Sequence, residues 1–328
     1  MNFIMLTGHR KSGTTLLHKL FDSHPNLNVY PVDLTVLYAY YPKWINTNVT
    51  NLEKRERFAH VIRKSFKEIS KKIILKNGQT FNTEEYIKIL IDKYEIDSLN
   101  TVPSLIRAIS DGYCSYMNLD RSLPFLFKET SQAVNLTNML EDNLNIMTIQ
   151  IIRDPRDNYA AIKSGVKNYY SKYNENELES LSSLLNRARL DLELAAQLIK
   201  THSKNFSVIR YEDLVANPKK EMKKIQEFLK IDWSSTMLAP TIAGQDFHGN
   251  TYDLRKTLGI SQESVGCWSS RINKEEALVI EEWMGGAMSV FNYKITSTSK
   301  ERKKAIAVFY AWYNTRYFYR DSFSELIE

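Results

Sequence analysis

A glycine-bounded polar segment near the start of the chain has the residue types of an anion-binding loop. A short apolar run, residues 3–6, leads into it, and apolar residues with helical spacing follow it. The segment is therefore predicted to connect a strand to a helix, where backbone N–H groups, a lysine and hydroxyls can hold phosphate oxygens. Its sequence is Gly8-His9-Arg10-Lys11-Ser12-Gly13-Thr14-Thr15.

The spacing within this loop differs from that of nucleoside triphosphate-binding loops. A Walker A loop has a glycine, four residues, and then Gly-Lys followed by Ser or Thr, so that the lysine reaches the outer phosphates. Four residues do separate Gly8 from Gly13, but Thr14 occupies the lysine position, and Lys11 precedes the second glycine. This argues against a nucleotide or small-molecule kinase, which stays open as an alternative together with a strand-to-helix turn of incidental polarity.

A second candidate segment, Arg153-Asp154-Pro155-Arg156-Asp157, follows an apolar run at residues 146–152. Ligands of open parallel sheets bind beyond the carboxyl ends of the strands. A guanidinium there offers a fork of donors that suits a phosphate dianion. Arg153 is therefore a candidate phosphate ligand, although pairing with Asp154 or Asp157 in an ordinary ion network is the alternative.

Two later segments add to the pattern. The first follows an apolar run at residues 206–209, and the second lies nearer the carboxyl terminus and combines basic residues with glycine and tryptophan. They are Arg210-Tyr211-Glu212-Asp213-Leu214 and Arg255-Lys256 with Gly266-Cys267-Trp268. In this order, the four segments resemble those of sulfotransferases that use 3′-phosphoadenosine 5′-phosphosulfate (PAPS), and the resemblance runs from Leu6 to about Tyr293.

The resemblance implies roles for the residues that match. The product of the reaction would be adenosine 3′,5′-bisphosphate (PAP). Lys11 would neutralise charge on the leaving phosphate, while Arg10, Ser12, Gly13, Thr14 and Thr15 would bind the 5′-phosphosulfate. Arg153 would bind the 3′-phosphate, Tyr211 would lie beside the adenine, and Arg255, Lys256 and Gly266 would close over the 3′-phosphate, with Arg271 as a further candidate.

One position departs from the family pattern. A serine commonly lies eight residues after the first arginine of the second segment and contacts the same phosphate, but here that residue is Ala161. Losing a hydroxyl contact to a charged oxygen costs roughly 1.5 to 3 kcal/mol if nothing replaces it. Ser164, one helical turn further on, is a candidate replacement.

The acceptor must lose a proton, so a general base is needed. We propose Asp33, which lies near the position where glycan-type members of the family place a glutamate; a turn or cap carboxylate is the alternative. The segment Lys128-Glu129-Thr130 offers a second possibility, because cytosolic members carry Lys-Thr-His there. In that register Lys128 matches an active-site lysine, Thr130 takes the histidine position, and Glu129 becomes the alternative base.

The order of the predicted elements is typical of an α/β protein. Short apolar runs rich in branched or aromatic residues suit strands buried on both faces of a parallel sheet. Apolar residues spaced three or four apart from Leu178 to Ile199 predict a crossover helix, and Asn217-Pro218 marks the start of another. We expect a three-layer α/β/α fold similar to that of P-loop NTPases. Its predicted strands include residues 3–6, 124–127, 146–152 and 206–209.

No repeat, low-complexity stretch or flexible linker divides the 328 residues, so a single domain is predicted over residues 1–328. Residues 35–123 have polar helical patterns and many tyrosines. They predict a helical insertion over the sheet, either a substrate lid or a structural cap. Residues 300–328 predict an aromatic helix that packs on the body or on a second subunit, which would form a homodimer.

Composition narrows the partners. Apolar content of 43% and charged content of 25% are ordinary for a soluble protein, and no run approaches the ~18 apolar residues of a membrane span. A net charge of +6 suits an anionic co-substrate but is too diffuse to indicate nucleic acid. Neither Cys114 nor Cys267 has metal-ligand spacing, and no metal site is expected. An early first strand leaves no room for an export signal, so a cytoplasmic location is expected.

The resulting functional prediction is sulfuryl transfer from PAPS to a hydroxyl or amine of an acceptor such as a carbohydrate or another small molecule. The mechanism would resemble phosphoryl transfer, an in-line displacement that depends on positioning and charge stabilisation. A catalytically inactive binding protein of the same fold is a third possibility, because Ala161 departs from the family pattern. The acceptor itself is not specified, since family members share the cofactor half of the site and differ in the acceptor half.

Overall fold

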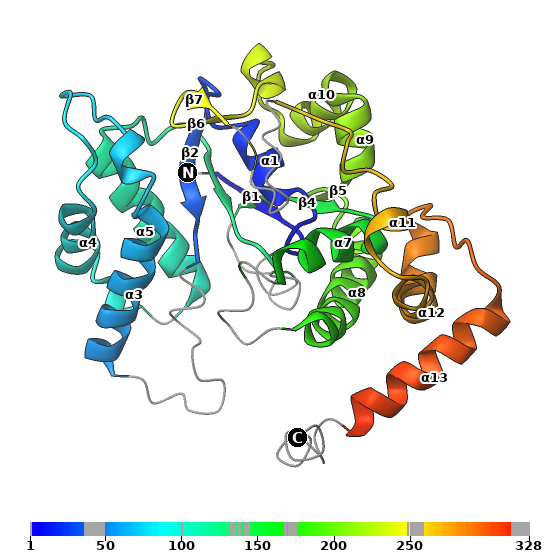
Figure 1. Ribbon diagram of the computed structural model, residues 1–328. Coiled ribbons are helices and arrows are strands. Elements are labelled where there is room, and N and C mark those ends of the chain that lie inside the picture. The colour runs from blue at the N-terminus through cyan, green and yellow to red at the C-terminus, as the bar shows by residue number, and fades with distance from the viewer. Residues whose placement is uncertain are drawn as a thin grey trace.

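A five-stranded parallel sheet forms the centre of the computed structural model (Figure 1), which describes residues 2–35, 50–99, 101–131, 136, 140, 145–166, 169, 176–247, 249 and 259–315. The strand order is β2-β3-β1-β4-β5, and every neighbouring pair runs parallel. The strands are β1 (Phe3–Thr7), β2 (Asn28–Asp33), β3 (Phe125–Lys128), β4 (Ile146–Ile152) and β5 (Phe206–Arg210).

Both faces of the sheet are covered, as its apolar strands predict. Alternate residues of β1 point to opposite faces, so Phe3 and Met5 join one hydrophobic core while Ile4 and Leu6 join the other. Helices on each side complete these cores, and the expected three-layer α/β/α architecture is confirmed.

One core contains residues of three helices that cover one face of the sheet. They are α1 (Thr14–Lys19), α9 (Tyr211–Ala216) and α10 (Pro218–Leu229). The opposite core contains residues of α7 (Pro155–Gly165) and the crossover helix α8 (Glu177–Thr201). Helix α10 begins at the proline that the sequence indicates. Minor elements are the 3-10 turns Ser70–Lys72, Ile96–Ser98 and Ser235–Leu238 and the hairpin β6 (Thr241–Ile242) and β7 (Gln245–Asp246).

The strand β2 is an edge strand that the sequence does not indicate. It contains Pro31, and its register against β3 shifts between Val29 and Asp33. Proline lacks the N–H group that a central strand needs, so it is confined to edges and irregular positions. A consequence is that Asp33 ends a strand at the sheet edge, opposite Lys128 of β3.

The region predicted as a helical insertion contains α3 (Asn51–Phe66), α4 (Thr83–Asp92) and α5 (Val102–Met117). In Figure 1 they lie together on the side of β2. Many of its aromatic residues build a core: the ring of Phe66 stacks on that of Phe81 at 4.7 Å, and Tyr113 meets Tyr30 of β2 edge-on at 5.1 Å. This packing accounts for much of the aromatic content of the insertion.

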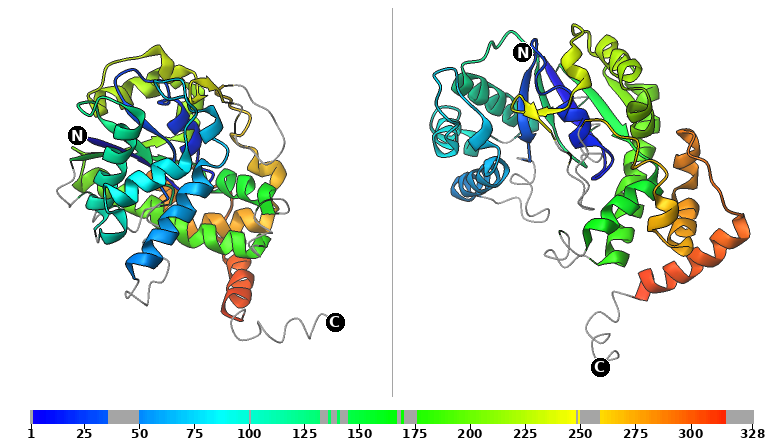
Figure 2. Two further views of the ribbon diagram at one scale, coloured as in Figure 1. Left: turned by 90° about the vertical axis from the view of Figure 1, so that its left-hand side faces the viewer. Right: turned by 45° about the horizontal axis from the view of Figure 1, so that its top comes forward.

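The carboxyl-terminal part contains α11 (Trp268–Arg271), α12 (Lys274–Val290) and α13 (Ser299–Thr315). Helix α13 packs on α12, where the rings of Trp283 and Phe309 meet edge-on at 5.9 Å, and otherwise projects from the body (Figure 2). Packing on the body therefore agrees with one of the two expectations, and a homodimer stays a prediction. Residues 316–328 of the predicted aromatic helix lie outside the described residues. Within the described part, no helix is both long and apolar enough to cross a bilayer.

Candidate functional site

A cavity of about 390 Å³ lies at the carboxyl-terminal edge of the sheet. Residues at or just beyond the carboxyl ends of all five strands contribute to its wall, which is where open parallel sheets bind ligands. The candidate residues from the sequence that line it are Arg10, Lys11, Gly13, Thr14, Thr15, Asp33, Lys128, Arg153, Ser164, Tyr211 and Arg271. Ser12, Glu129 and Gly266 lie outside this wall, and Arg255 and Lys256 lie outside the described residues.

The loop after β1, residues 8–13, follows a tight path that requires its glycines. A Cβ atom on Gly8 would lie 2.2 Å from the backbone oxygen of Ile151, and one on Gly13 would lie 2.5 Å from the Tyr211 ring. Both glycines have positive φ, and so does Lys11, at 65°. A lysine in this left-handed conformation costs on the order of 1 kcal/mol, and such residues cluster at functional sites.

Helix α7 braces this loop from the side. Asn158 donates from Nδ2 to the backbone oxygen of Arg10 at 2.7 Å, and its Oδ1 lies 2.7 Å from His9 Nδ1. Since Asn158 donates through its amide nitrogen, its oxygen accepts the His9 Nδ1 proton. Burial lowers the pKa of His9 to about 3, so the imidazole is neutral and carries a free lone pair on Nε2.

Arg153 spans the gap between the loop and a later segment. Its guanidinium donates to the backbone oxygens of Lys11 at 3.0 Å and Ser264 at 2.6 Å, and it lies over the Tyr211 ring at 4.7 Å. Burial raises the pKa of Tyr211, which keeps the phenol neutral. The hydrogen bonds of the guanidinium are thus made to neutral backbone oxygens. Burial raises the pKa of the Asp157 carboxyl, and Arg153 lies near enough for its charge to oppose that rise.

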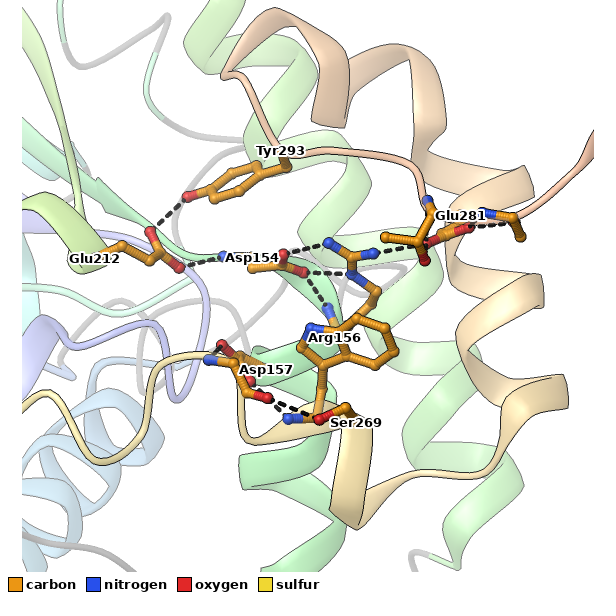
Figure 3. Close-up of polar contacts among 11 residues, drawn as sticks. Asp154, Arg156, Asp157, Glu212, Ser269, Glu281 and Tyr293 are labelled. Carbon is orange, nitrogen blue, oxygen red and sulfur yellow. Dashed lines mark hydrogen bonds and ion pairs between the residues drawn. The ribbon is translucent and has the colours of Figure 1, made fainter.

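The later segment, residues 259–268, is attached to α7 by Asp157 (Figure 3). The Asp157 carboxylate accepts from the backbone N–H of Gly266 at 2.6 Å and of Trp268 at 2.9 Å. The guanidinium of Arg156 covers the Trp268 ring at 4.4 Å. Gly266 therefore serves through its backbone, and Asp157 binds the segment whose Ser264 contacts Arg153.

A buried ion network lies behind Arg153 (Figure 3). Arg156 donates to both carboxylate oxygens of Asp154, at 3.0 and 2.7 Å, and to Glu281 at 2.6 Å. The backbone N–H of Asp154 donates to Glu212, whose other oxygen accepts from Tyr293. The Asp154 carboxylate is thus engaged by Arg156, and Asp154 also caps α7 at the point where Arg153 leaves β4.

The opposite wall of the cavity carries a paired lysine and carboxylate. Lys128 forms an ion pair with Asp33, and Thr130 donates to the second Asp33 oxygen at 3.3 Å. All three side chains line the cavity. The structure therefore unites Asp33 and Lys128, which the sequence offers through two separate segments.

Glu129 has different surroundings. Its side chain is fully buried and accepts the backbone N–H of Thr35 at 2.7 Å. Burial, together with the charge of Asp33, raises its pKa to about 8. Of the two candidate bases, only Asp33 lines the cavity.

Ala161 and Ser164 both line the cavity on α7, and Ser164 Oγ donates to the Ala161 backbone oxygen at 2.9 Å. A hydroxyl can leave such a bond for an anion by rotation about one torsion. Sequence reasoning missed other lining residues, namely Leu16, Tyr169, Phe247, Gly249, Gly259 and Ser261. Most of them lie in irregular segments without periodicity, so no pattern marks them. In the described part of the chain no three His, Cys, Asp or Glu side chains cluster as a metal site would require.

A parallel sheet with helices on both faces and a glycine-bounded anion loop after β1 defines an α/β protein of P-loop-like architecture. The sequence pattern of the sulfotransferase family matches residues 4–235, and the chain belongs to this family. A search of curated protein sequences gives no match.

Solved structures agree with this fold. The sulfotransferase domain from the curacin biosynthetic pathway superimposes with a TM-score of 0.55 at 18% identity, over 90% of this chain and 99% of that domain. The sulfotransferase domain from the Synechococcus PCC 7002 olefin synthase gives a TM-score of 0.53 at 18% identity, over 90% of this chain and 96% of that domain.

Proposed function

We propose that the protein transfers a sulfuryl group from PAPS to a hydroxyl or amine of an acceptor. One observation carries this proposal: a single cavity joins a cationic anion-binding wall, formed by the loop after β1 and Arg153, to a wall that holds Asp33, Lys128 and Thr130. The first wall suits the phosphates of a co-substrate, and the second can receive the acceptor. The bond from sulfur to the bridging phosphate oxygen breaks, and a bond to the acceptor forms.

The residues of the anion-binding wall support this proposal. The lysine, hydroxyls and loop N–H groups of this wall suit the 5′-phosphosulfate, and Lys11 can meet charge that develops on the bridging oxygen. Arg153 suits the 3′-phosphate, with Ser164 supplying the hydroxyl that Ala161 lacks, and Tyr211 offers a ring for the adenine. We extend the 3′-phosphate site to Arg255, Lys256 and Gly266 as a proposal from the family resemblance.

Asp33 is the proposed general base. Lys128 and Thr130 hold its two oxygens, so its carboxylate is oriented at the cavity surface. It can take the proton that the acceptor hydroxyl or amine releases, and Lys128 adds positive charge beside the transferring group. Glu129 stays the alternative base. Because it is buried behind the cavity wall and accepts from the Thr35 backbone N–H, it could reach the acceptor only if the Thr35 backbone moved.

Replacing Asp33 with asparagine should lower kcat by about 10²- to 10⁴-fold, the usual contribution of a positioned acid or base. The affinity for PAP should change little, because Asp33 lies on the acceptor wall. Single-turnover kinetics and calorimetry measure the two quantities. Glu129→Gln is the matched control and should keep most activity; the reverse pattern would assign the base to Glu129.

Replacing Arg153 with alanine should weaken PAP binding by about ten- to a hundredfold, because charge-assisted hydrogen bonds contribute roughly 1.5 to 3 kcal/mol. Titration calorimetry measures the dissociation constant. Arg189→Ala removes an exposed arginine on α8 and should leave the affinity unchanged. An Arg153→Ala variant that binds PAP like the parent protein would remove the arginine from the cofactor site.

Two alternative functions, a kinase and an inactive binding protein, can each be tested. The lysine position in the loop after β1 disfavours a kinase, and thermal protection by ATP with Mg²⁺ but not by PAP would favour it. Ser164 Oγ donates a hydrogen bond to the Ala161 backbone oxygen. If it keeps that bond when the co-substrate binds, the 3′-phosphate lacks a hydroxyl contact, which would suit an inactive binding protein. Tight PAP binding without sulfate transfer to a broad panel of hydroxyl and amine acceptors would support that function.

A further inference from the structure

A second, much smaller cavity lies behind the loop after β1. Its volume is about 10 Å³, and its polar lining comes from the loop, β4 and the crossover helix α8. The side chains of His9, Ser12, Gln150 and Asp191 are each at most 5% exposed. Arg153 contributes to this cavity as well as to the larger one. The cavity therefore lies between the candidate phosphate loop and the body of the fold.

Each of these four side chains has a buried polar atom that no described residue satisfies. The atoms are His9 Nε2, Ser12 Oγ, Gln150 Oε1 and Asp191 Oδ2, and Arg153 Nε is a fifth. The large majority of buried side-chain polar atoms in proteins have a partner, either protein or ordered water. Several unsatisfied atoms around one cavity therefore indicate a bound ligand that can donate and accept.

The hydrogen-bonding roles of these atoms can be assigned. His9 Nδ1 donates to Asn158, so Nε2 of the neutral ring is an acceptor. Gln150 donates from Nε2 to the Asp191 backbone oxygen at 2.9 Å, so its Oε1 is also an acceptor. The Ser12 hydroxyl can donate, and so can the Asp191 carboxyl in its protonated form. These four side chains thus present two acceptors and two donors, and Arg153 Nε is a third donor at the same cavity.

We propose that this cavity is a binding site for one water molecule, which donates to His9 and Gln150 and accepts from Ser12 and Asp191. A volume of ~10 to 15 Å³ holds one water, and buried waters make about three hydrogen bonds. The water joins the loop to β4 and α8, so it supports the loop from behind. A cation fits less well, because the Arg153 guanidinium at the same cavity repels positive charge.

The charged groups around Asp191 agree with a donor role. Burial raises its pKa to about 7, and the charge of Arg187 on the same helix opposes part of this shift. From the loop, His9 faces it as a neutral ring, and Arg153 faces the cavity from the end of β4. An unfolded aspartate titrates near pH 4. Between about pH 4 and pH 7 the folded chain binds the extra proton, so this group's contribution to stability falls as pH rises.

The Asp191→Asn variant tests the donor role, because an amide donates at every pH. Its melting temperature should be close to that of the parent protein near pH 4, should exceed it increasingly up to about pH 7, and should keep a constant excess above that pH. The measurement uses the full chain without any co-substrate, so it does not depend on the proposed function. Asp213→Asn, at a half-exposed carboxylate, is the control and should show no such divergence. A difference that stays constant with pH would overturn the role of Asp191 as a donor.

A crystal structure of the parent protein tests the site itself. One density peak within about 3.2 Å of at least three of the four atoms is expected for the water. Rubidium soaking separates the occupants, because a cation site would give an anomalous signal there. Either that signal, or direct pairing of the four side chains without a peak, would overturn the proposal.

Discussion

Replacing Lys11 with alanine is expected to reduce kcat for sulfuryl transfer by at least roughly a hundredfold, the usual effect of removing one group that stabilises charge in the transition state. Lys11 lines the cavity and takes a left-handed conformation in a loop whose glycines fit closely against β4 and Tyr211. Its backbone oxygen binds Arg153, and the substitution keeps that contact. The loss should therefore fall on the chemical step more than on binding.

Calorimetry with PAP and single-turnover transfer from PAPS separate these two effects. We expect the dissociation constant for PAP to change by less than about tenfold, since the loop N–H groups and Arg153 remain. Lys219→Ala removes an exposed lysine on α10 and should match the parent protein in both measurements. Rates like those of the parent protein in Lys11→Ala would contradict the proposed mechanism, whatever its affinity for PAP.

The elements around the cofactor wall could be predicted because their signals are local. A glycine-bounded polar loop after an apolar run and an arginine directly after the longest predicted strand each mark a strand end, and carboxyl ends of parallel strands meet at one edge. The cavity does contain Lys11, Arg153 and Tyr211 together. Their roles toward PAPS stay predictions.

The acceptor wall could not be predicted in the same way. Because β2 contains Pro31, strand propensity does not predict this strand. Without β2 in the predicted sheet, nothing in the sequence indicates that Asp33 and Lys128 form an ion pair. Neighbouring residues at a strand end point to opposite sides, so Lys128 faces the cavity while Glu129 enters the interior. Such a difference depends on register, which a single segment does not specify.

Contacts between segments far apart in the chain could not be predicted from the sequence either. Asp157 and Gly266 are far apart in the chain, yet their hydrogen bond attaches the later segment to α7. Gly266 thus contributes its backbone N–H, which donates to Asp157. Asp157 in turn positions the segment whose Ser264 backbone oxygen accepts from Arg153. Nothing in the composition of either segment indicates this pairing.

Replacing Arg156 with methionine should lower the free energy of unfolding by about 3 to 5 kcal/mol, the usual effect of removing one partner from a buried ion pair. The Arg156 side chain is 4% exposed, and it binds both Asp154 and Glu281. Methionine fills much of the same space, so the loss measures uncompensated charge rather than an empty volume. Urea unfolding without co-substrate gives the free energy directly.

A double variant separates charge from packing. Adding Glu281→Gln to Arg156→Met removes one of the two uncompensated carboxylates, while an amide can still accept from Thr296 and Ser297, which donate to Glu281 in the parent protein. Part of the lost stability should return in the double variant, because only the Asp154 carboxylate then lacks the guanidinium. That carboxylate still accepts a hydrogen bond from the backbone N–H of residue 156. A single variant that loses less than about 1 kcal/mol, as an exposed pair would, would show that this buried network contributes little to the stability of the fold.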